Sequence, residues 1–145
     1  MGGGNPPWRL RALVAVLGVV FVGYGSSLLS RHQAEQVTAN RIADELGTRE
    51  VFVLVSDPSS PFDYPKSNEA LSRTGFSIRR CEQTREEFNC FPWAGMSPSE
   101  VLGPFLVEVR WGADRGGLSG YGARTRYLVF FGLVVTIRDV DAWAS

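Results

Sequence analysis

The longest hydrophobic stretch of the chain lies near its N-terminus. Residues 12–30 contain no charged side chain. In a helix that rises about 1.5 Å per residue they would cover about 28 Å, close to the thickness of a membrane's hydrocarbon core. In water such a helix would need burial on every side, which a small domain rarely provides. The pattern predicts a transmembrane helix over residues 12–30, with a short tail of residues 1–11 before it and a domain of residues 31–145 after it.

The same N-terminal pattern has a second interpretation, a cleaved signal peptide. Two arginines precede the apolar run, and residues 25–27 are small enough for a cleavage site. The apolar run is longer than the 7–15 residues typical of a signal peptide, no A-x-A triplet follows it, and two leucines extend it past the small residues. We therefore favour a signal anchor, and the alternative is a small secreted domain released by cleavage.

The positive charges beside the span predict its orientation. Arg9, Arg11 and the α-amino group lie on the N-terminal side, against Arg31 on the other. Because positive charges near a span stay in the cytoplasm, we expect a single-pass protein of the cell membrane with a cytoplasmic N-terminus and an extracytoplasmic domain. Gly23 and Ser27 form a small-xxx-small pair, which would allow another helix to approach closely.

The first half of the domain alternates helical and extended patterns. Residues 33–46 place Ala39, Ile42 and Ala43 on one face, and Gly47 follows as a helix stop, so they predict a helix that continues the membrane segment. Residues 51–55 are a short β-branched run typical of a buried strand, and residues 76–80 alternate like a strand. Between them we expect a proline-rich loop over residues 57–68 and a short helix over residues 69–73, capped by Asn68.

The second half is dominated by strand patterns. Residues 105–111 alternate cleanly, with Phe105, Val107, Val109 and Trp111 on one face. Residues 126–138 are apolar on both faces, which predicts a central strand with a bulge or close approach at Gly132. A glycine-rich stretch over residues 112–122 is expected to join these two strands as antiparallel neighbours, and residues 97–100 match a helix capping box.

Together these elements predict an α+β fold. We expect the single transmembrane helix to be extended by an amphipathic helix and followed by a small, mainly antiparallel sheet of about four strands with short helices.

Composition and charge exclude several classes of protein. The chain is 44% hydrophobic and 12% aromatic, which is too apolar for a disordered protein. Its 15 basic and 15 acidic residues cancel, and the acids all follow residue 32, so the basic surplus typical of nucleic-acid-binding proteins is absent. The expected partners are the lipid membrane, through residues 12–30, and other membrane or envelope proteins; no nucleic acid is expected.

Cys81 and Cys90 are the only cysteines, and we expect them to form a disulfide. In an oxidising compartment the bridge would close a loop of about ten residues and contribute about 2–3 kcal/mol. The alternative is two ordinary thiols in a reducing compartment. A metal site is disfavoured because two thiolates need two further ligands, and His32, the one histidine, lies next to the membrane segment. We expect no metal and no cofactor.

The absence of histidine from residues 33–145 limits the chemistry of the domain. A Ser-His-Asp or Cys-His arrangement cannot be built there. An enzymatic or ligand-binding domain would have to use carboxylates, for which residues 86–87 and the pair Asp139 and Asp141 are candidates, or a dyad with Lys66. We predict no catalytic residues.

The favoured function is a non-enzymatic interaction or assembly subunit of a membrane or envelope complex. The stretch after Cys90 is rich in residue types found at interface cores, and arginines flank the glycine-rich loop. The alternative for Phe91 and Trp93 is simple core packing. The candidate interaction residues are Phe91, Trp93, Met96, Arg115, Tyr121 and Arg124.

Overall fold

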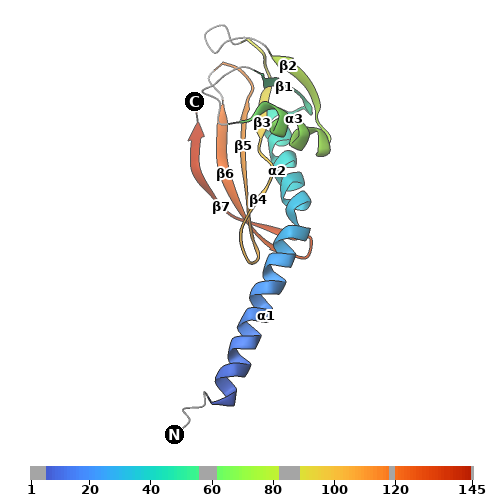
Figure 1. Cartoon of the computed structure of the whole chain (residues 1–145). Helices are drawn as coiled ribbons and strands as arrows, with labels where there is room; N and C mark the ends of the chain where they lie inside the picture. Colours follow the sequence, from blue (N-terminus) through green and yellow to red (C-terminus); the bar gives the residue numbers. More distant parts are fainter. Residues whose placement is uncertain (1–5, 56–61, 82–88, 118–119, 145) are drawn as a thin grey trace.

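A long N-terminal helix carries a compact head (Figure 1). The computed structural model describes residues 6–55, 62–81, 89–117 and 120–144. Helix α1 (Pro7–Leu29) projects from the head, and α2 (Arg31–Leu46) follows after the single residue Ser30. Gly47 ends α2 in the left-handed conformation, with φ of 69°. The predicted helical extension of the apolar segment is confirmed.

Helix α1 has the length and composition of a membrane span. Among the described residues it is the one helix long and apolar enough to cross a bilayer, and most of its surface is exposed along the part that leaves the head. Exposed positions such as Leu13, Val14 and Val16 point in different directions around it. The finding is compatible with a membrane anchor and also with a signal sequence, because both share this pattern.

The head contains a seven-stranded mixed sheet. Its central path runs β2-β1-β3-β5-β6-β7, and β4 also pairs with β5, on the edge where β3 pairs. Strand β1 is parallel to β2 and β3, whereas the remaining pairs are antiparallel. The strands are β1 (Glu50–Leu54), β2 (Ser77–Cys81), β3 (Trp93–Met96), β4 (Glu100–Gly103), β5 (Leu106–Asp114), β6 (Tyr121–Phe130) and β7 (Leu133–Ala144).

The α+β class is confirmed, but the expectation of about four strands is wrong. The predicted central strand over residues 126–138 is two strands, because Phe131 and Gly132 adopt positive φ values of 42° and 92° and reverse the chain. Gly132 is therefore part of a hairpin turn. The glycine-rich stretch does join antiparallel strands, as expected, but much of it belongs to β5 and β6.

Two predicted local elements also differ. The capping-box segment starts no helix: Glu100 opens strand β4, and the backbone N–H and hydroxyl of Ser99 both donate to the buried carboxylate of Glu35. Helix α3 (Tyr64–Arg73) begins earlier than predicted, because Asp63, not Asn68, is its N-cap and accepts from the amide of Lys66. In the first case a long-range contact, between Ser99 and Glu35, takes the place of the local capping bond.

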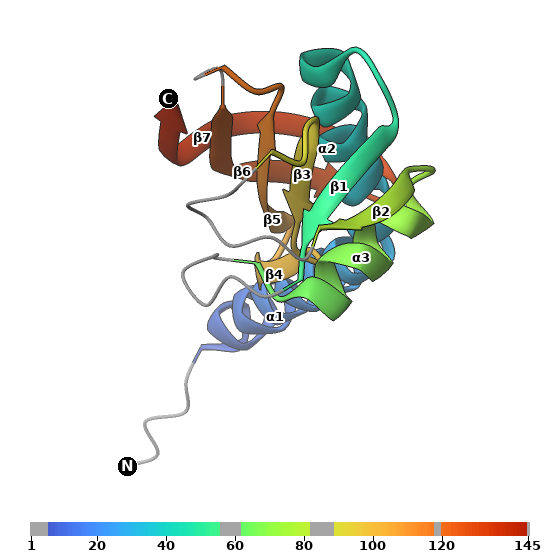
Figure 2. The same ribbon diagram turned by 90° about the horizontal axis from the view of Figure 1, so that it is seen from above.

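Helices α2 and α3 lie on one face of the sheet, which we call the inner face. Figure 2, seen from above, shows α2 beside β5, β6 and β7, with α3 beside β1 to β3. The expected alternation is confirmed for Val107, Val109 and Trp111, which are buried on the inner face. It is wrong for Phe105, which lies in the turn before β5 with a φ of 57°. Glu108 and Arg110 point to the opposite, outer face, which no described helix covers.

Candidate functional site

A row of three glycines crosses the outer face of the sheet. Gly95 on β3, Gly112 on β5 and Gly122 on β6 are direct neighbours in the strand register. A Cβ atom at Gly95 would lie 2.7 Å from the ring of Phe62, and at Gly112 3.2 Å from that of Trp93. At Gly122 it would collide with the indole of Trp143. The row therefore forms a trough that only glycine can provide.

Three aromatic rings fill this trough. The rings of Phe62 and Trp93 lie 5.9 Å apart, and Trp143 reaches both Gly112 and Gly122. Trp93 is 8% exposed, whereas Trp143 is 42% exposed. Among the described residues, the buried indole nitrogen of Trp93 has no hydrogen-bond acceptor. Trp93 is thus the buried ring in the trough, and Trp143 is the accessible one.

A shallow pocket opens beside the trough, and we call it the outer-face pocket. It has a volume of about 310 Å³. Arg124 forms an ion pair with Asp141 at its edge, while Arg110 has no ion-pair partner within the described part of the chain. The pocket thus offers an aromatic surface next to a free guanidinium group. Its lining consists of Phe62, Arg110, Trp111, Ala123, Arg124, Asp141 and Trp143.

On the inner face, a polar cluster joins α2 to the last two strands. Arg41 donates two hydrogen bonds to the carboxylate of Asp139, at 2.8 and 2.6 Å. The hydroxyls of Thr125 and Tyr121 donate to the same carboxylate at 2.7 and 2.9 Å, and the indole of Trp111 donates to Thr125. The hydrogen bonds from Arg41 lower the pKa of Asp139 to about 2. A carboxylate with four donors is a structural anion, poorly suited to accept a proton in catalysis.

The two aspartates proposed as a carboxylate pair do not share a face. Asp139 faces α2, whereas Asp141 lies on the outer face beside Arg124. The register of β6 and β7 shifts between Val140 and Trp143, and Asp141 in this bulge adopts a positive φ of 51°. The bulge cancels the two-residue periodicity on which the expectation rested. The other pair, residues 86–87, lies outside the described residues.

A second polar cluster fixes α2 near the base of the head. Glu35 is 3% exposed, and its carboxylate accepts from Arg73 at 2.9 Å and from the amide and hydroxyl of Ser99. Arg31 donates to the backbone carbonyl of Ser99 at 2.7 Å. These bonds tie α2 to α3 and to the residue before β4.

The junction between α1 and the head is also a polar contact. Ser26, Ser27 and Ser30 are fully buried. Their hydroxyls bond to backbone groups in and beside two turns of the head, at residues 103 and 106 and at residues 129, 131 and 132. The small residues that would allow another helix to approach instead accommodate the turn of this head, where Gly23 meets Pro104 and Phe105.

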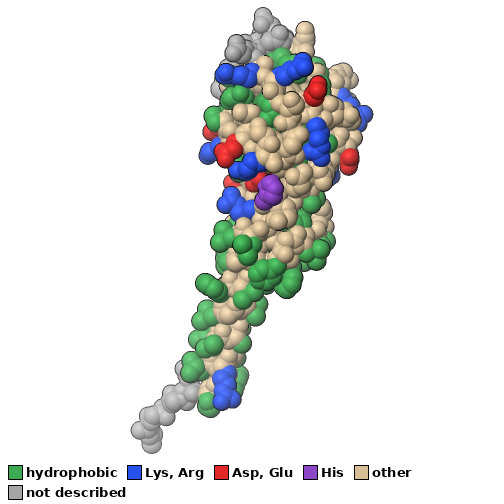
Figure 3. Space-filling view, turned by 90° about the vertical axis from the view of Figure 1, so that its right-hand side faces the viewer, with side chains coloured by type: hydrophobic (Ala, Val, Ile, Leu, Met, Phe, Trp, Pro, Cys, Tyr) green, Lys and Arg blue, Asp and Glu red, His purple; other side chains and the backbone are tan. Residues whose placement is uncertain are grey.

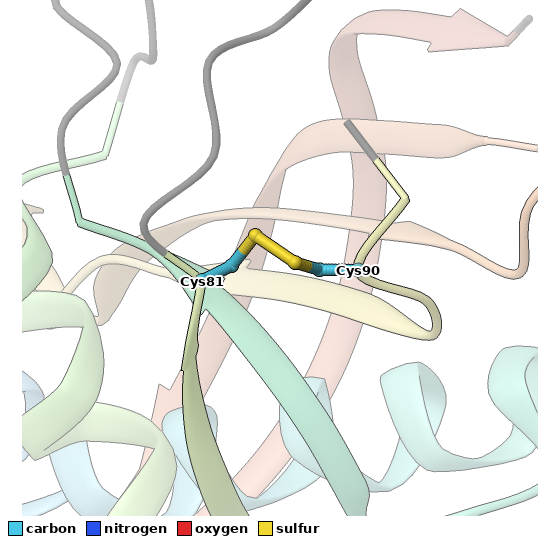
Figure 4. Close-up of a disulfide and its surroundings, with 2 residues drawn as sticks. All are labelled: Cys81 and Cys90. Atoms are coloured by element: carbon cyan, nitrogen blue, oxygen red, sulfur yellow. A yellow bond between two sulfur atoms is a disulfide. The ribbon is translucent and has the colours of Figure 1, made fainter. Parts of the chain in front are cut away.

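The predicted disulfide is present. Cys81 at the end of β2 is bonded to Cys90, just before β3, so the bridge passes across the end of β1 (Figure 4). It therefore fixes the segment that leads into Trp93 and the aromatic trough.

The structure separates the six candidate interaction residues. Arg124 lines the outer-face pocket, and Trp93 lies in the aromatic trough beside it. Met96 is fully buried in the core, so its side chain is not available to a partner. Tyr121 is bonded to Asp139 on the inner face. Phe91 is half-buried against Gly116, and Arg115 is exposed beyond the end of β5.

Sequence reasoning missed Trp143, Arg110 and the glycine row. The sequence contains one usable signal: Gly95, Gly112 and Gly122 each interrupt an apolar strand pattern, which marks a close approach. Their common register depends on the strand pairing, which the sequence pattern does not define.

Within the described ranges, no group of three or more histidine, cysteine, aspartate or glutamate residues is arranged to hold a metal ion. No protein-family model, curated protein or solved structure matches this chain.

Proposed function

We propose that the chain is a single-pass membrane protein whose head is a non-enzymatic interaction subunit of a membrane or envelope complex. The outer-face pocket carries this proposal. It combines the exposed ring of Trp143 with Arg110, an arginine that the described part of the head leaves unpaired. Tryptophan and arginine are the residue types enriched at the energetic centres of protein interfaces.

The junction supports a retained anchor over a cleaved signal peptide. Cleavage at the small residues 25–27 would remove or disrupt Ser26 and Ser27, whose hydroxyls bond to the head. The two turns would then lose buried partners for their backbone groups, at a cost of about 1–3 kcal/mol for each group left unsatisfied. Intact-mass measurement of the purified protein distinguishes the two forms.

Two features support an extracytoplasmic head. The disulfide between Cys81 and Cys90 is typical of an oxidising compartment. Arg9 and Arg11 precede the span, which favours a cytoplasmic N-terminus. Protease protection of terminal tags in sealed vesicles tests this orientation: the C-terminal tag should be accessible from the extracytoplasmic side, and the N-terminal tag protected.

The interaction role is tested by gentle detergent extraction from the native membrane at the native expression level. We expect a stoichiometric companion that is lost with Arg110→Glu and retained with Arg79→Glu. Arg79 is an exposed arginine on β2, at the opposite edge of the sheet, so the control makes the same charge change away from the pocket. A lone monomer or homo-oligomer would overturn the interaction role. A companion that is retained by both Arg110→Glu and Arg79→Glu would show that it does not bind at the outer-face pocket.

A further inference from the structure

The base of the head overlaps the end of the apolar helix. The amide of Phe105 donates to the carbonyl of Gly23 at 3.0 Å, and the contacts with the head continue to Ser30. Of the uncharged run, only residues 12–22 precede these contacts, and 11 residues cover about 16 Å. The hydrocarbon core of a bilayer is about 30 Å thick. A span that crosses it must include residues 23–30, and the turns beside them must then lie at the same depth.

The two turns beside residues 23–30 carry exposed hydrophobic side chains. We call residues 102–105 and 130–133 the membrane-proximal turns. Phe130 and Leu133 are 58% and 65% exposed, and no charged residue occurs between positions 127 and 137. Figure 3 shows hydrophobic side chains gathered where the head meets the helix and continuing down it, with the charged groups of the head above them and a further basic group at the far end of the helix. The exposed set is Leu102, Leu128, Phe130, Phe131, Leu133, Val135 and Ile137.

The backbone of both turns is bonded in the way that a hydrocarbon environment requires. The hydroxyl of Ser27 donates to the carbonyl of Gly103 at 2.8 Å and accepts from the amide of Leu106 at 3.1 Å. The hydroxyl of Ser26 links the carbonyl of Val129 to the amide of Phe131. An unpaired backbone group costs several kcal/mol in lipid, so irregular backbone is tolerated there only when protein partners satisfy it. The serines of α1 supply such partners.

Each turn places a phenylalanine where glycine is normally preferred. Phe105 and Phe131 adopt positive φ values of 57° and 42°. A bulky side chain in this region of backbone space is strained, and such strain is concentrated where function requires the residue. Both rings pack against Phe130, at centroid distances of 6.0 and 5.1 Å. An aromatic cluster thus forms the lowest part of the head.

Arginines lie just above the apolar band. Arg126, two positions from Leu128 on β6, pairs in register with Arg138 on β7. Arg138 is exposed, and Arg126 donates to Glu108 at 2.9 Å. Arg31 follows the uncharged run on the helix. Guanidinium groups at this level match the phosphate layer of a bilayer, as expected if the band below them lies in hydrocarbon.

We propose that the membrane-proximal turns insert into the hydrocarbon of the leaflet on the side of the head. The inference rests on the proposed membrane anchor and goes beyond the interaction role. Lipid acyl chains are the occupant that fits best, because the exposed band is continuous with the lipid-facing surface of α1 and carries no charge. The head is thereby fixed at a set height and orientation on the membrane.

The test uses the full-length chain in nanodiscs of phosphatidylcholine and phosphatidylglycerol, with one copy in each disc and, in a parallel sample, two copies. A nitroxide label is attached to Leu133→Cys or Leu102→Cys, one in each turn, and the native cysteines stay in their disulfide. Collisions with oxygen, which concentrates in lipid, are compared with collisions with a water-soluble nickel complex. Leu17→Cys in the middle of α1 is the lipid reference, and Val37→Cys on α2 is the water reference.

We expect labels at positions 133 and 102 to lose nickel accessibility and gain oxygen accessibility, as at position 17. If the label at position 17 reports lipid but the labels in the two turns report water, as at position 37, the insertion of the turns is overturned while the membrane anchor stands. If position 17 itself reports water, the anchor and the insertion both fail. Labels in the turns that become shielded from both reagents in discs with two copies would show that a second copy covers the band, which also overturns lipid insertion.

Discussion

Arg41 on α2 and Asp139 on β7 lie 98 positions apart in the chain and form an ion pair with two hydrogen bonds. The side chain of Asp139 is 19% exposed and that of Arg41 36%. Hydroxyls of Thr125 and Tyr121 complete the coordination of the carboxylate. The pair fixes α2 against the edge strand of the sheet.

The ion pair predicts a specific dependence of stability on pH. The pKa of Asp139 falls from 3.8 to about 2, so the folded state is stabilised above about pH 4 and loses this contribution as pH falls toward 2. After allowance for solvent screening we expect about 1–2 kcal/mol. Asp139→Asn should lower the free energy of unfolding by this amount at pH 7 and flatten its decline between pH 4 and 2. Thermal unfolding of the detergent-solubilised chain across this range measures both effects.

Asp141→Asn is the matched control, because the side chain of Asp141 is 66% exposed and its pair with Arg124 is on the outer face. It should change stability by less than about 1 kcal/mol. An acid dependence that is the same in wild type and Asp139→Asn would contradict the role assigned to the ion pair.

The glycine row predicts that a single methyl group added to one of its glycines lowers the stability of the head. Gly122→Ala places a Cβ against the indole of Trp143 and should destabilise the head by about 1–3 kcal/mol through overpacking. Gly103→Ala meets no atom within 4 Å and should be tolerated. In the Trp143→Ala background the cost of Gly122→Ala should largely disappear. Equal costs in both backgrounds, measured by denaturant unfolding, would show that Trp143 does not occupy the trough.

Two glutamates that share one arginine should differ sharply in their contribution to the stability of the head. Arg73 bonds to buried Glu35 and to Glu69, whose side chain is 66% exposed. Glu35→Ala also leaves the amide and hydroxyl of Ser99 without their acceptor, so we expect the free energy of unfolding to fall by about 3–5 kcal/mol. Glu69→Ala removes only an exposed i,i+4 pair and should cost about 0.3–0.5 kcal/mol. Similar melting temperatures for the two variants would refute the anchoring role of Glu35.

The disulfide predicts a moderate and measurable stabilisation. Replacing both Cys81 and Cys90 by serine opens a loop with a sequence separation of nine and should cost about 2–3 kcal/mol. In cells, the native pair should resist alkylation unless a reductant is added first, as read by intact mass. Free thiols in the protein isolated under alkylating conditions would argue against an oxidising compartment.

The local sequence pattern was sufficient to predict those elements that depend only on residues close together in the chain. The apolar run that forms α1, the helix that ends at Gly47 and the alternation of Val107, Val109 and Trp111 are all properties of neighbouring residues, so the sequence alone predicted them. The disulfide followed from having only two cysteines. The turn at Phe131 was missed because a phenylalanine at positive φ carries no local signal, and the flanking residues read as one continuous strand.

The candidate site depended on long-range pairing. Gly95, Gly112 and Gly122 become one trough only through strand register, and Arg110 and Trp143 meet there from strands on either side of β6. Likewise, Gly23 and Ser27 could have allowed another helix to approach, but the turn of this head lies against them instead. The sequence by itself determined which segments are apolar, helical or extended, because those properties follow from local periodicity. Only the tertiary structure decided which polar and aromatic groups meet, because their contacts join residues far apart in the chain.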